Sequence, residues 1–175
     1  MTADLRDHIR DIPDFPKPGI LYKDITPLLL DAGALRTAIT ALADWARPRR
    51  VDFVVAAEAR GFILGAALAL ELDAGFVPAR KPGKLPSQTV SAEYILEYGV
   101  DALEMHADAL ADGARVLLHD DLLATGGTAR ALAQLAEGAG AEIAGCAFLV
   151  ELAFLDGRAQ LAEYDVHTLI SYDAE

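Results

Sequence analysis

Two adjacent carboxylates and a turn of small residues form the stretch of this chain that is best suited to chemistry. Asp120 and Asp121 follow an apolar run and precede five residues without long side chains: Ala124, Thr125, Gly126, Gly127 and Thr128. Small residues let the backbone approach an anion closely, and glycine permits positive φ. Free backbone N–H groups and the dipole of a helix that starts here favour phosphate. Carboxylates accept hydrogen bonds from sugar hydroxyls. The pattern predicts a site for a phosphorylated sugar.

Simpler interpretations of this stretch exist. A glycine-rich connection from strand to helix occurs in many α/β proteins, and one acid would serve as a helix N-cap worth about 1 kcal/mol. A cap explains one of the two carboxylates but hardly both. Other phosphate fingerprints, GxxxxGK[ST] and GxGxxG after a strand, do not occur in the sequence.

The charge balance makes the positions of the basic residues informative. The net charge of −12 opposes binding to nucleic acids and anionic membranes, and it also opposes a phosphorylated substrate. Any such substrate therefore needs local cations. All four lysines, Lys17, Lys23, Lys81 and Lys84, lie in two loop-like segments before residue 85. They either face a ligand or cluster by chance.

Residues 116–129 resemble the phosphoribosyl-diphosphate motif of the type I phosphoribosyltransferases, and four further segments resemble the adenine-specific members of that family. The resemblance implies transfer of the phosphoribosyl group of 5-phosphoribosyl-1-diphosphate to adenine, giving AMP and diphosphate in purine salvage. It also implies Mg²⁺ bound mainly through the substrate rather than by direct protein ligation, an oxocarbenium-like transition state and a homodimer. Asp120 and Asp121 would hold the ribose hydroxyls, and residues 124–128 the 5′-phosphate.

The segment of residues 57–62 resembles the diphosphate loop of the family. The resemblance makes Arg60 a catalytic diphosphate ligand, and the planar fork of a guanidinium suits two phosphate oxygens. In the family the peptide that joins Ala59 and Arg60 can have an unusual geometry. The alternative for Arg60 is a surface arginine at the end of a strand.

Residues 80–86 carry three basic groups within five positions and resemble the flexible catalytic loop of the family. The resemblance implies that Arg80, Lys81 and Lys84 stabilise the departing diphosphate. A closing loop would also exclude water from the activated sugar. The alternative is a solvated run of charges.

Residues 94–99 follow that loop and match the adenine-type signature. Attack by N9 of a purine requires loss of its proton, and the resemblance makes Glu97 the acceptor and Tyr98 a cover for the reaction centre. The alternative for Glu97 is an exposed strand residue.

Residues 14–27 resemble the hood that binds the base in this family. Leu21 and Tyr22 match the positions that sandwich the base, and Lys23 follows them. The family usually has Phe at Tyr22 and often Arg at Lys23, and lysine lacks the two-pronged geometry of arginine. These departures affect base affinity and closure more than the reaction type.

Two further residues invite competing interpretations. His119 stands where the motif usually has Val or Ile, and it is either a hydrogen-bonded core residue or a group that orients a neighbouring acid. Cys146, the one cysteine, lies in an apolar run and is expected to be a buried structural thiol. A single cysteine allows no disulfide within the chain and fits a reducing, cytoplasmic location.

Hydrophobic patterns predict strands that alternate with helices, hence an α/β fold with three layers and a mainly parallel twisted sheet. Residues 12–28 and 79–90 are expected to be loops, the first being the hood and the second mobile, within one domain that spans residues 1–175. A hairpin is expected within residues 91–106, with its turn at 99–101. The expected strands are 52–57, 75–78, 115–119, 142–151 and 166–171, and the expected helices are 3–11, 34–45, 62–72, 128–137 and a weak one at 153–162.

Two other functions compete with adenine transfer. One is a regulatory phosphoribosyltransferase domain that binds the ligand without catalysis, and the other is an enzyme for a 6-oxopurine. The chain has no room for a DNA-binding domain, and no stretch reaches the ~18 apolar residues that span a bilayer. The base hood and residues 96–99 favour adenine over a 6-oxopurine.

Overall fold

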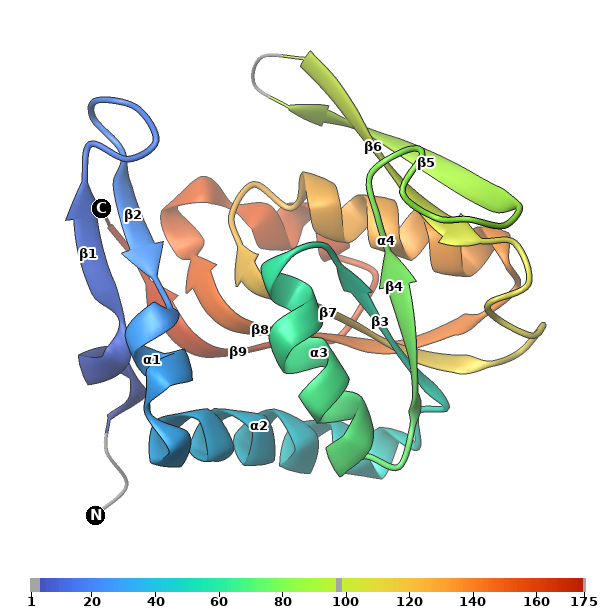
Figure 1. The fold of residues 1–175 in the computed structure, drawn as a ribbon, viewed down its shortest axis with the longest axis horizontal. Helices are drawn as coiled ribbons and strands as arrows, with labels where there is room; N and C mark the ends of the chain where they lie inside the picture. Colours follow the sequence, from blue (N-terminus) through green and yellow to red (C-terminus); the bar gives the residue numbers. More distant parts are fainter. Residues whose placement is uncertain (1–3, 97–98, 175) are drawn as a thin grey trace.

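A computed structural model describes residues 4–96 and 99–174 and is built on a five-stranded parallel sheet. Figure 1 shows this sheet in the middle of the molecule, with the strand order β4-β3-β7-β8-β9. The strands are β3 (Phe53–Ala57), β4 (Gly75–Ala79), β7 (Arg115–Leu123), β8 (Glu142–Leu152) and β9 (Val166–Tyr172). Each lies within a few residues of the strand expected from its apolar pattern.

Helices cover both faces of the sheet, so the expected three-layer α/β fold is confirmed. α2 (Ala32–Ala46) and α3 (Arg60–Glu71) pack on one face, and α4 (Gly127–Gly138) packs on the other (Figure 1). The alternation of side chains along the strands explains this division. Val54 packs in the cluster beneath α2 and α3, whereas its neighbour Val55 packs in the cluster that contains the apolar face of α4.

Two antiparallel hairpins flank the main sheet. The first pairs β1 (Arg10–Pro13) with β2 (Leu21–Asp24) and leads into α1 (Thr26–Leu30). The expectation of a loop over residues 12–28 was therefore wrong. Its prolines lie at the end of β1, in the connection to β2 and at the start of α1, where a missing N–H costs no ladder or helix bond.

The second hairpin pairs β5 (Thr89–Leu96) with β6 (Gly99–His106) and packs on α4. The expected hairpin is confirmed, but residues 99–101 belong to β6 and not to the turn. The loop expected at 79–90 occupies residues 80–88, because Ala79 ends β4 and Thr89 begins β5.

Short 3-10 helices replace two of the expected α-helices. η1 (Leu5–His8) stands in place of the helix expected at residues 3–11. A further short helix, η2 (Arg47–Arg49), follows α2 and replaces no expected helix. The weak helix expected at 153–162 is split into η3 (Ala153–Leu155) and η4 (Gly157–Leu161) by Asp156, whose φ of 52° is left-handed. Among the helices of the described residues, none has the length and apolar content to cross a membrane.

The order of the strands creates a crevice between β3 and β7. The helix after β3 covers one face of the sheet and the helix after β7 covers the other, and ligands of open α/β sheets bind at such a point. β7 pairs with β3 only as far as His119, opposite Ala56, but it pairs with the longer β8 as far as Leu123. The strand therefore runs past Asp120 and Asp121, where an end at residue 119 was expected, and both acids border the crevice.

Candidate functional site

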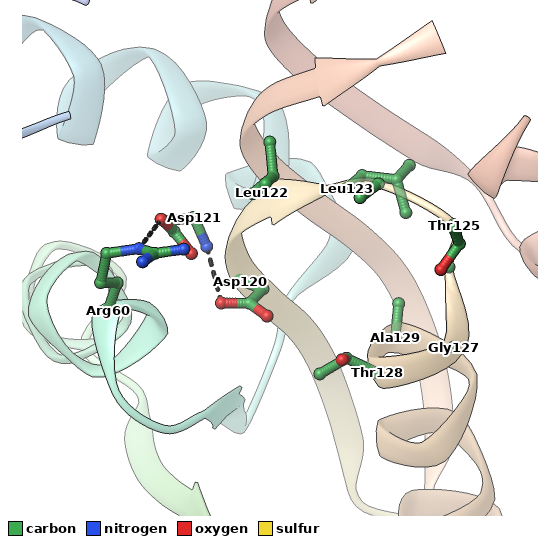
Figure 2. Close-up of a pocket in the computed structure, with 11 residues that line it drawn as sticks. Arg60, Asp120, Asp121, Leu122, Leu123, Thr125, Gly127, Thr128 and Ala129 are labelled. Atoms are coloured by element: carbon green, nitrogen blue, oxygen red, sulfur yellow. Dashed lines mark hydrogen bonds and ion pairs between the residues drawn. The ribbon is translucent and has the colours of Figure 1, made fainter. Parts of the chain in front are cut away.

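A pocket of about 190 Å³ opens at the carboxyl end of β7. Arg60 lines one side, and the other side is a continuous stretch of chain from Asp120 to Ala129. Figure 2 shows these residues wrapped around the pocket, from the end of β7 through the turn into the first residues of α4. The structure thus brings together the acid pair, the small-residue turn and one of the predicted basic ligands.

The two acids of the pair point in different directions, as their neighbouring positions on a strand predict. Asp121 is only 4% exposed and accepts a hydrogen bond of 2.5 Å from Nε of Arg60. Asp120 accepts a bond of 2.9 Å from the N–H of Asp121 and lies beside Gly61 (Figure 2). Burial and the neighbouring carboxylate raise the pKa of Asp120 well above its usual value.

The turn before α4 combines a left-handed glycine with a helix start that has no side-chain cap. Gly126 has a left-handed φ of 86°, and Gly127 begins the helix, so only the first glycine uses its conformational freedom. No side chain caps this helix start, so the first N–H groups of α4, which belong to residues that line the pocket, have no side-chain acceptor. A Cβ on Gly126 would lie 2.5 Å from the carbonyl oxygen of Gly157, so η4 supports the turn from behind.

A second pocket of about 290 Å³ adjoins the first and shares Arg60, both acids and Thr128 with it. Its other lining residues come from the loop after β3, from residue 81 and from the second hairpin: Glu58, Ala59, Lys81, Tyr94 and Leu103. A cis peptide bond joins Glu58 to Ala59, one position before the peptide at which the family resemblance implies unusual geometry.

Three of the predicted basic ligands are paired with carboxylates around these pockets. Arg60 pairs with Asp121, Arg80 pairs with Glu58 at 2.7 Å, and Lys81 pairs with Asp101. The hydrogen bond with Asp101 raises the pKa of Lys81 and lowers the pKa of Asp101. The site thus offers cations held in place by anions, inside a strongly acidic protein.

The hood residues are divided between the crevice and the outer side of the hairpin. The hydroxyl of Tyr22 accepts a hydrogen bond from Nη1 of Arg60, so Tyr22 borders the crevice. Lys23 turns away, because its Nζ pairs with Asp11 at 2.8 Å and lies 4.2 Å from the centroid of the Tyr172 ring. None of the three predicted base-binding residues, Leu21, Tyr22 and Lys23, is among the described residues that line the two pockets.

The remaining predicted ligands are distributed as follows. Arg80 is paired with Glu58 and donates a hydrogen bond of 3.2 Å to the carbonyl oxygen of Lys84. The side chain of Lys84 is exposed. Glu97 and Tyr98 lie outside the described residues.

Sequence reasoning assigned no role to Glu58, Tyr94 or Asp101, which lie in or beside the second pocket. Glu58 had a usable signal, because it directly follows a buried strand and precedes Arg60. Tyr94 and Asp101 had no such signal, since they face each other only through the register of the second hairpin.

His119 and Cys146 are core residues. His119 is fully buried, and its Nδ1 lies 2.8 Å from the carbonyl oxygen of Ala147, which confirms the interpretation as a hydrogen-bonded core histidine. Burial lowers the pKa of His119 to about 4 and raises the pKa of the Cys146 thiol to about 12. Neither group is suited to proton transfer or nucleophilic attack near neutral pH.

Comparisons with known proteins agree with one another. Residues 29–170 match the family described as phosphoribosyl transferase domain. The adenine phosphoribosyltransferase of Kosmotoga olearia is 55% identical over 168 residues, which cover 96% of this chain and 99% of the relative. The crystal structure of adenine phosphoribosyltransferase from Thermoanaerobacter pseudethanolicus has a TM-score of 0.95 at 53% identity, covering 98% of this chain and 100% of that chain.

A third comparison includes bound ligands. The adenine phosphoribosyltransferase of Saccharomyces cerevisiae, crystallised with adenine and an imino-altritol bisphosphate, has a TM-score of 0.91 at 38% identity. The match covers 96% of this chain and 97% of the yeast chain.

Proposed function

The chain belongs to the phosphoribosyltransferase family, among its adenine phosphoribosyltransferases, and from this premise we propose how its residues carry out the reaction. The chain transfers the 5-phosphoribosyl group of 5-phosphoribosyl-1-diphosphate to adenine and gives AMP and diphosphate in purine salvage. The bond from C1′ to the diphosphate oxygen breaks, and the bond from C1′ to N9 of adenine forms. The electron pair of the broken bond leaves with diphosphate.

The turn of residues 124–128 would hold the 5′-phosphate, and Asp120 and Asp121 would hold the ribose hydroxyls. The exposed N–H groups at the start of α4 and the left-handed Gly126 support the first role. The two carboxylates at the mouth of the same pocket support the second role. Their carboxyl oxygens would also favour the positive character that develops on the ribose ring as the bond to diphosphate breaks.

Arg60 and Lys81 would bind the diphosphate from the second pocket, which both residues line. Arg80 and Lys84 would contribute from the loop that follows β4. Arg80 is paired with Glu58, which lines the second pocket. Each cation would stabilise negative charge on the leaving group, which grows as the C1′–O bond breaks.

Mg²⁺ would accompany the substrate in this site. No group of three or more His, Cys, Asp or Glu residues within 4–96 and 99–174 is arranged as a metal cage. Asp121 and Glu58 line the pocket but are paired with Arg60 and Arg80, so the site fits an ion that is held mainly by the oxygens of the substrate and by water. When bound, the ion would neutralise charge on the diphosphate.

Adenine would lie under the hood against Leu21 and Tyr22, with Lys23 behind them. Tyr22 supports this placement, because its hydroxyl reaches Arg60 at the crevice. Glu97 would accept the proton that N9 loses, and Tyr98 would cover the reaction centre. Both roles rest on the family resemblance of residues 94–99.

The observation that carries these assignments is one pocket that joins an uncapped helix start to two carboxylates and Arg60. The reaction is tested by measuring diphosphate release with adenine, hypoxanthine or guanine as the base. We expect release with adenine alone. Turnover with a 6-oxopurine would replace the base assignment, and ligand binding without turnover on any base would favour a regulatory domain.

The site assignments are tested separately by three variants of the folded protein. Asp120→Asn and Asp121→Asn should each raise KM for 5-phosphoribosyl-1-diphosphate, and Glu97→Gln should lower kcat about 100-fold while substrate binding persists. Wild-type kcat in Glu97→Gln would remove the proton-acceptor role without affecting the other assignments.

A homodimer in the cytoplasm completes the proposal, with residues 1–175 acting as one domain in which residues 12–28 form the hood and residues 80–88 the mobile loop. Leu30, Ile63 and Leu70 are 86%, 48% and 81% exposed on α1 and α3, and such apolar surface favours burial against a second subunit. Light scattering on the purified protein should give twice the chain mass of 18.6 kDa.

A further inference from the structure

Three carboxylates pair with the cations around the second pocket, and one of them differs from the other two. Asp121 and Glu58 line the pocket themselves, so each would share its space with a bound diphosphate. Asp101 is not among the described residues that line this pocket, although its partner Lys81 is. Lys81 is therefore presented to the pocket while its counter-ion stands outside it.

Asp101 is itself held by its surroundings on β6. Its Oδ1 accepts a bond of 2.9 Å from the N–H of Ala102, and its Oδ2 lies 3.3 Å from the hydroxyl of Tyr94. The side chain is 22% exposed, against 49% for Lys81. A partly buried carboxylate that accepts hydrogen bonds from two other donors is a well-held partner for a long and flexible lysine.

The hydrogen-bond partner Tyr94 lies close to the turn of residues 124–128. Tyr94 lines the second pocket together with Thr128, the last residue of that turn. The contacts run from Tyr94 through Asp101 to Lys81, at the edge of the second pocket. Strand β6 also fastens the start of the 80–88 loop, since Glu104 exchanges backbone bonds with Arg80 and its carboxylate accepts from the N–H of Gly83 at 3.1 Å.

We propose that Asp101 is a positioning residue that, with Tyr94, holds Lys81 aimed at the diphosphate, and so raises affinity for 5-phosphoribosyl-1-diphosphate. The inference rests on the proposed site, in which Lys81 binds the diphosphate. Asp101 touches no reacting atom. Its effect passes through Lys81. Because the ion pair already restricts the rotamers of the Lys81 side chain in the free protein, binding of the diphosphate costs less conformational entropy.

The first test is the dissociation constant of 5-phosphoribosyl-1-diphosphate, measured by calorimetry without adenine. Asp101→Asn keeps the shape of the side chain and removes its charge, and it should raise this constant about tenfold, the size of one charge-assisted hydrogen bond. KM for adenine should remain within a factor of two. Glu142→Gln, which breaks the exposed Arg115–Glu142 pair on β7 and β8, is the matched control and should change neither value.

The second test separates positioning from a general structural role. The titratable groups that face Lys81 are Asp101, Tyr94 and Glu58. Since the Asp101 hydrogen bond raises the pKa of Lys81, its removal should move the alkaline decline of substrate binding to lower pH. In a Lys81→Ala background, Asp101→Asn should have no further effect on binding, because the residue through which it acts is absent.

Each outcome decides the inference. Wild-type affinity in Asp101→Asn, an unmoved alkaline decline or an undiminished effect in the Lys81→Ala background would overturn it, and tighter binding would make Asp101 a competitor of the substrate. If Asp101→Asn does not fold, Tyr94→Phe must shift binding in the same direction, and an unchanged constant in that variant would overturn the inference. Loss of adenine-dependent diphosphate release in the wild-type protein would instead overturn the proposed function.

Discussion

The guanidinium of Arg60 lies within hydrogen-bond distance of the hydroxyl of Tyr22, 2.5 Å from Nη1 to Oη, and its Nε binds Asp121. One side chain at the start of α3 therefore joins the hairpin β1–β2 to the strand β7. These two elements carry the residues assigned to the base and to the sugar. Phe, the usual family residue at this position, has no hydroxyl for this bond.

Tyr22→Phe isolates the contribution of that hydroxyl. The phenyl ring keeps its face for the base, but Arg60 loses one of the two groups that hold it over the crevice. We expect KM for 5-phosphoribosyl-1-diphosphate to rise about threefold, because this charge-assisted bond is exposed and solvent weakens it, with a smaller change in KM for adenine. Tyr172→Phe, on β9, is the control. A larger effect on adenine than on the phosphoribosyl substrate would assign the hydroxyl to base binding.

Gly61→Ala should displace Asp120 without disturbing the fold. A Cβ at this position would lie 2.7 Å from Oδ1 of Asp120, so the carboxylate has to move. Misplacement of a substrate-binding group by about 1 Å costs on the order of 100-fold in kcat/KM. The control is Gly138→Ala at the end of α4, where a Cβ meets nothing within 4 Å. Steady-state kinetics at full activity for Gly61→Ala would show that the position of Asp120 is unimportant.

Gly126→Ala should abolish binding of the 5′-phosphate. Alanine at a φ of 86° is strained by about 1 kcal/mol, and its Cβ would meet the Gly157 carbonyl oxygen at 2.5 Å. Gly113→Ala is the matched control, because Gly113 also has a positive φ of 75° but has open space for a Cβ. Both variants should lower Tm, but only Gly126→Ala should lose affinity for ribose 5-phosphate in calorimetry. Equal affinities in the two variants would contradict the assignment of the turn of residues 124–128 to the 5′-phosphate.

His119 should make stability depend on pH in a defined window. The folded protein holds the pKa of His119 at about 4, whereas the unfolded chain takes up that proton below about pH 6.5. Between these values the unfolded state binds more protons, so stability falls as the pH falls from 6.5 to 4, by about 3 kcal/mol in total. Below pH 4 this group contributes no further loss.

Urea unfolding of the wild type and of His119→Val at pH 4.5, 5.5 and 7 measures this contribution. The wild type should lose more stability than the variant on acidification, since the variant has no proton to take up. Turnover at neutral pH should be nearly unchanged by the substitution, because His119 is bonded to the Ala147 carbonyl and faces the core. A large fall in kcat would instead assign His119 a part in catalysis.

Most of the sheet and its helices could be predicted from the sequence because their signals are local. Apolar runs such as residues 53–57, and the helical period that places Leu42 and Ala46 in the core, depend on neighbours within a few positions. The hairpin β1–β2 was missed because its prolines indicate a loop, whereas its two short strands are defined by pairing between residues about ten positions apart. The extension of β7 past His119 was missed because it depends on the length of β8.

The sequence by itself determined the kinds of groups at the site and their order along the chain, since small residues after two acids suit a phosphorylated sugar wherever they occur in an α/β fold. The tertiary structure decided which charges meet. Arg60 and Asp121 are 61 positions apart, and Lys81 and Asp101 are 20 apart. With 27 acidic side chains available, the selection of these partners follows from strand register and layer packing, which no local pattern encodes.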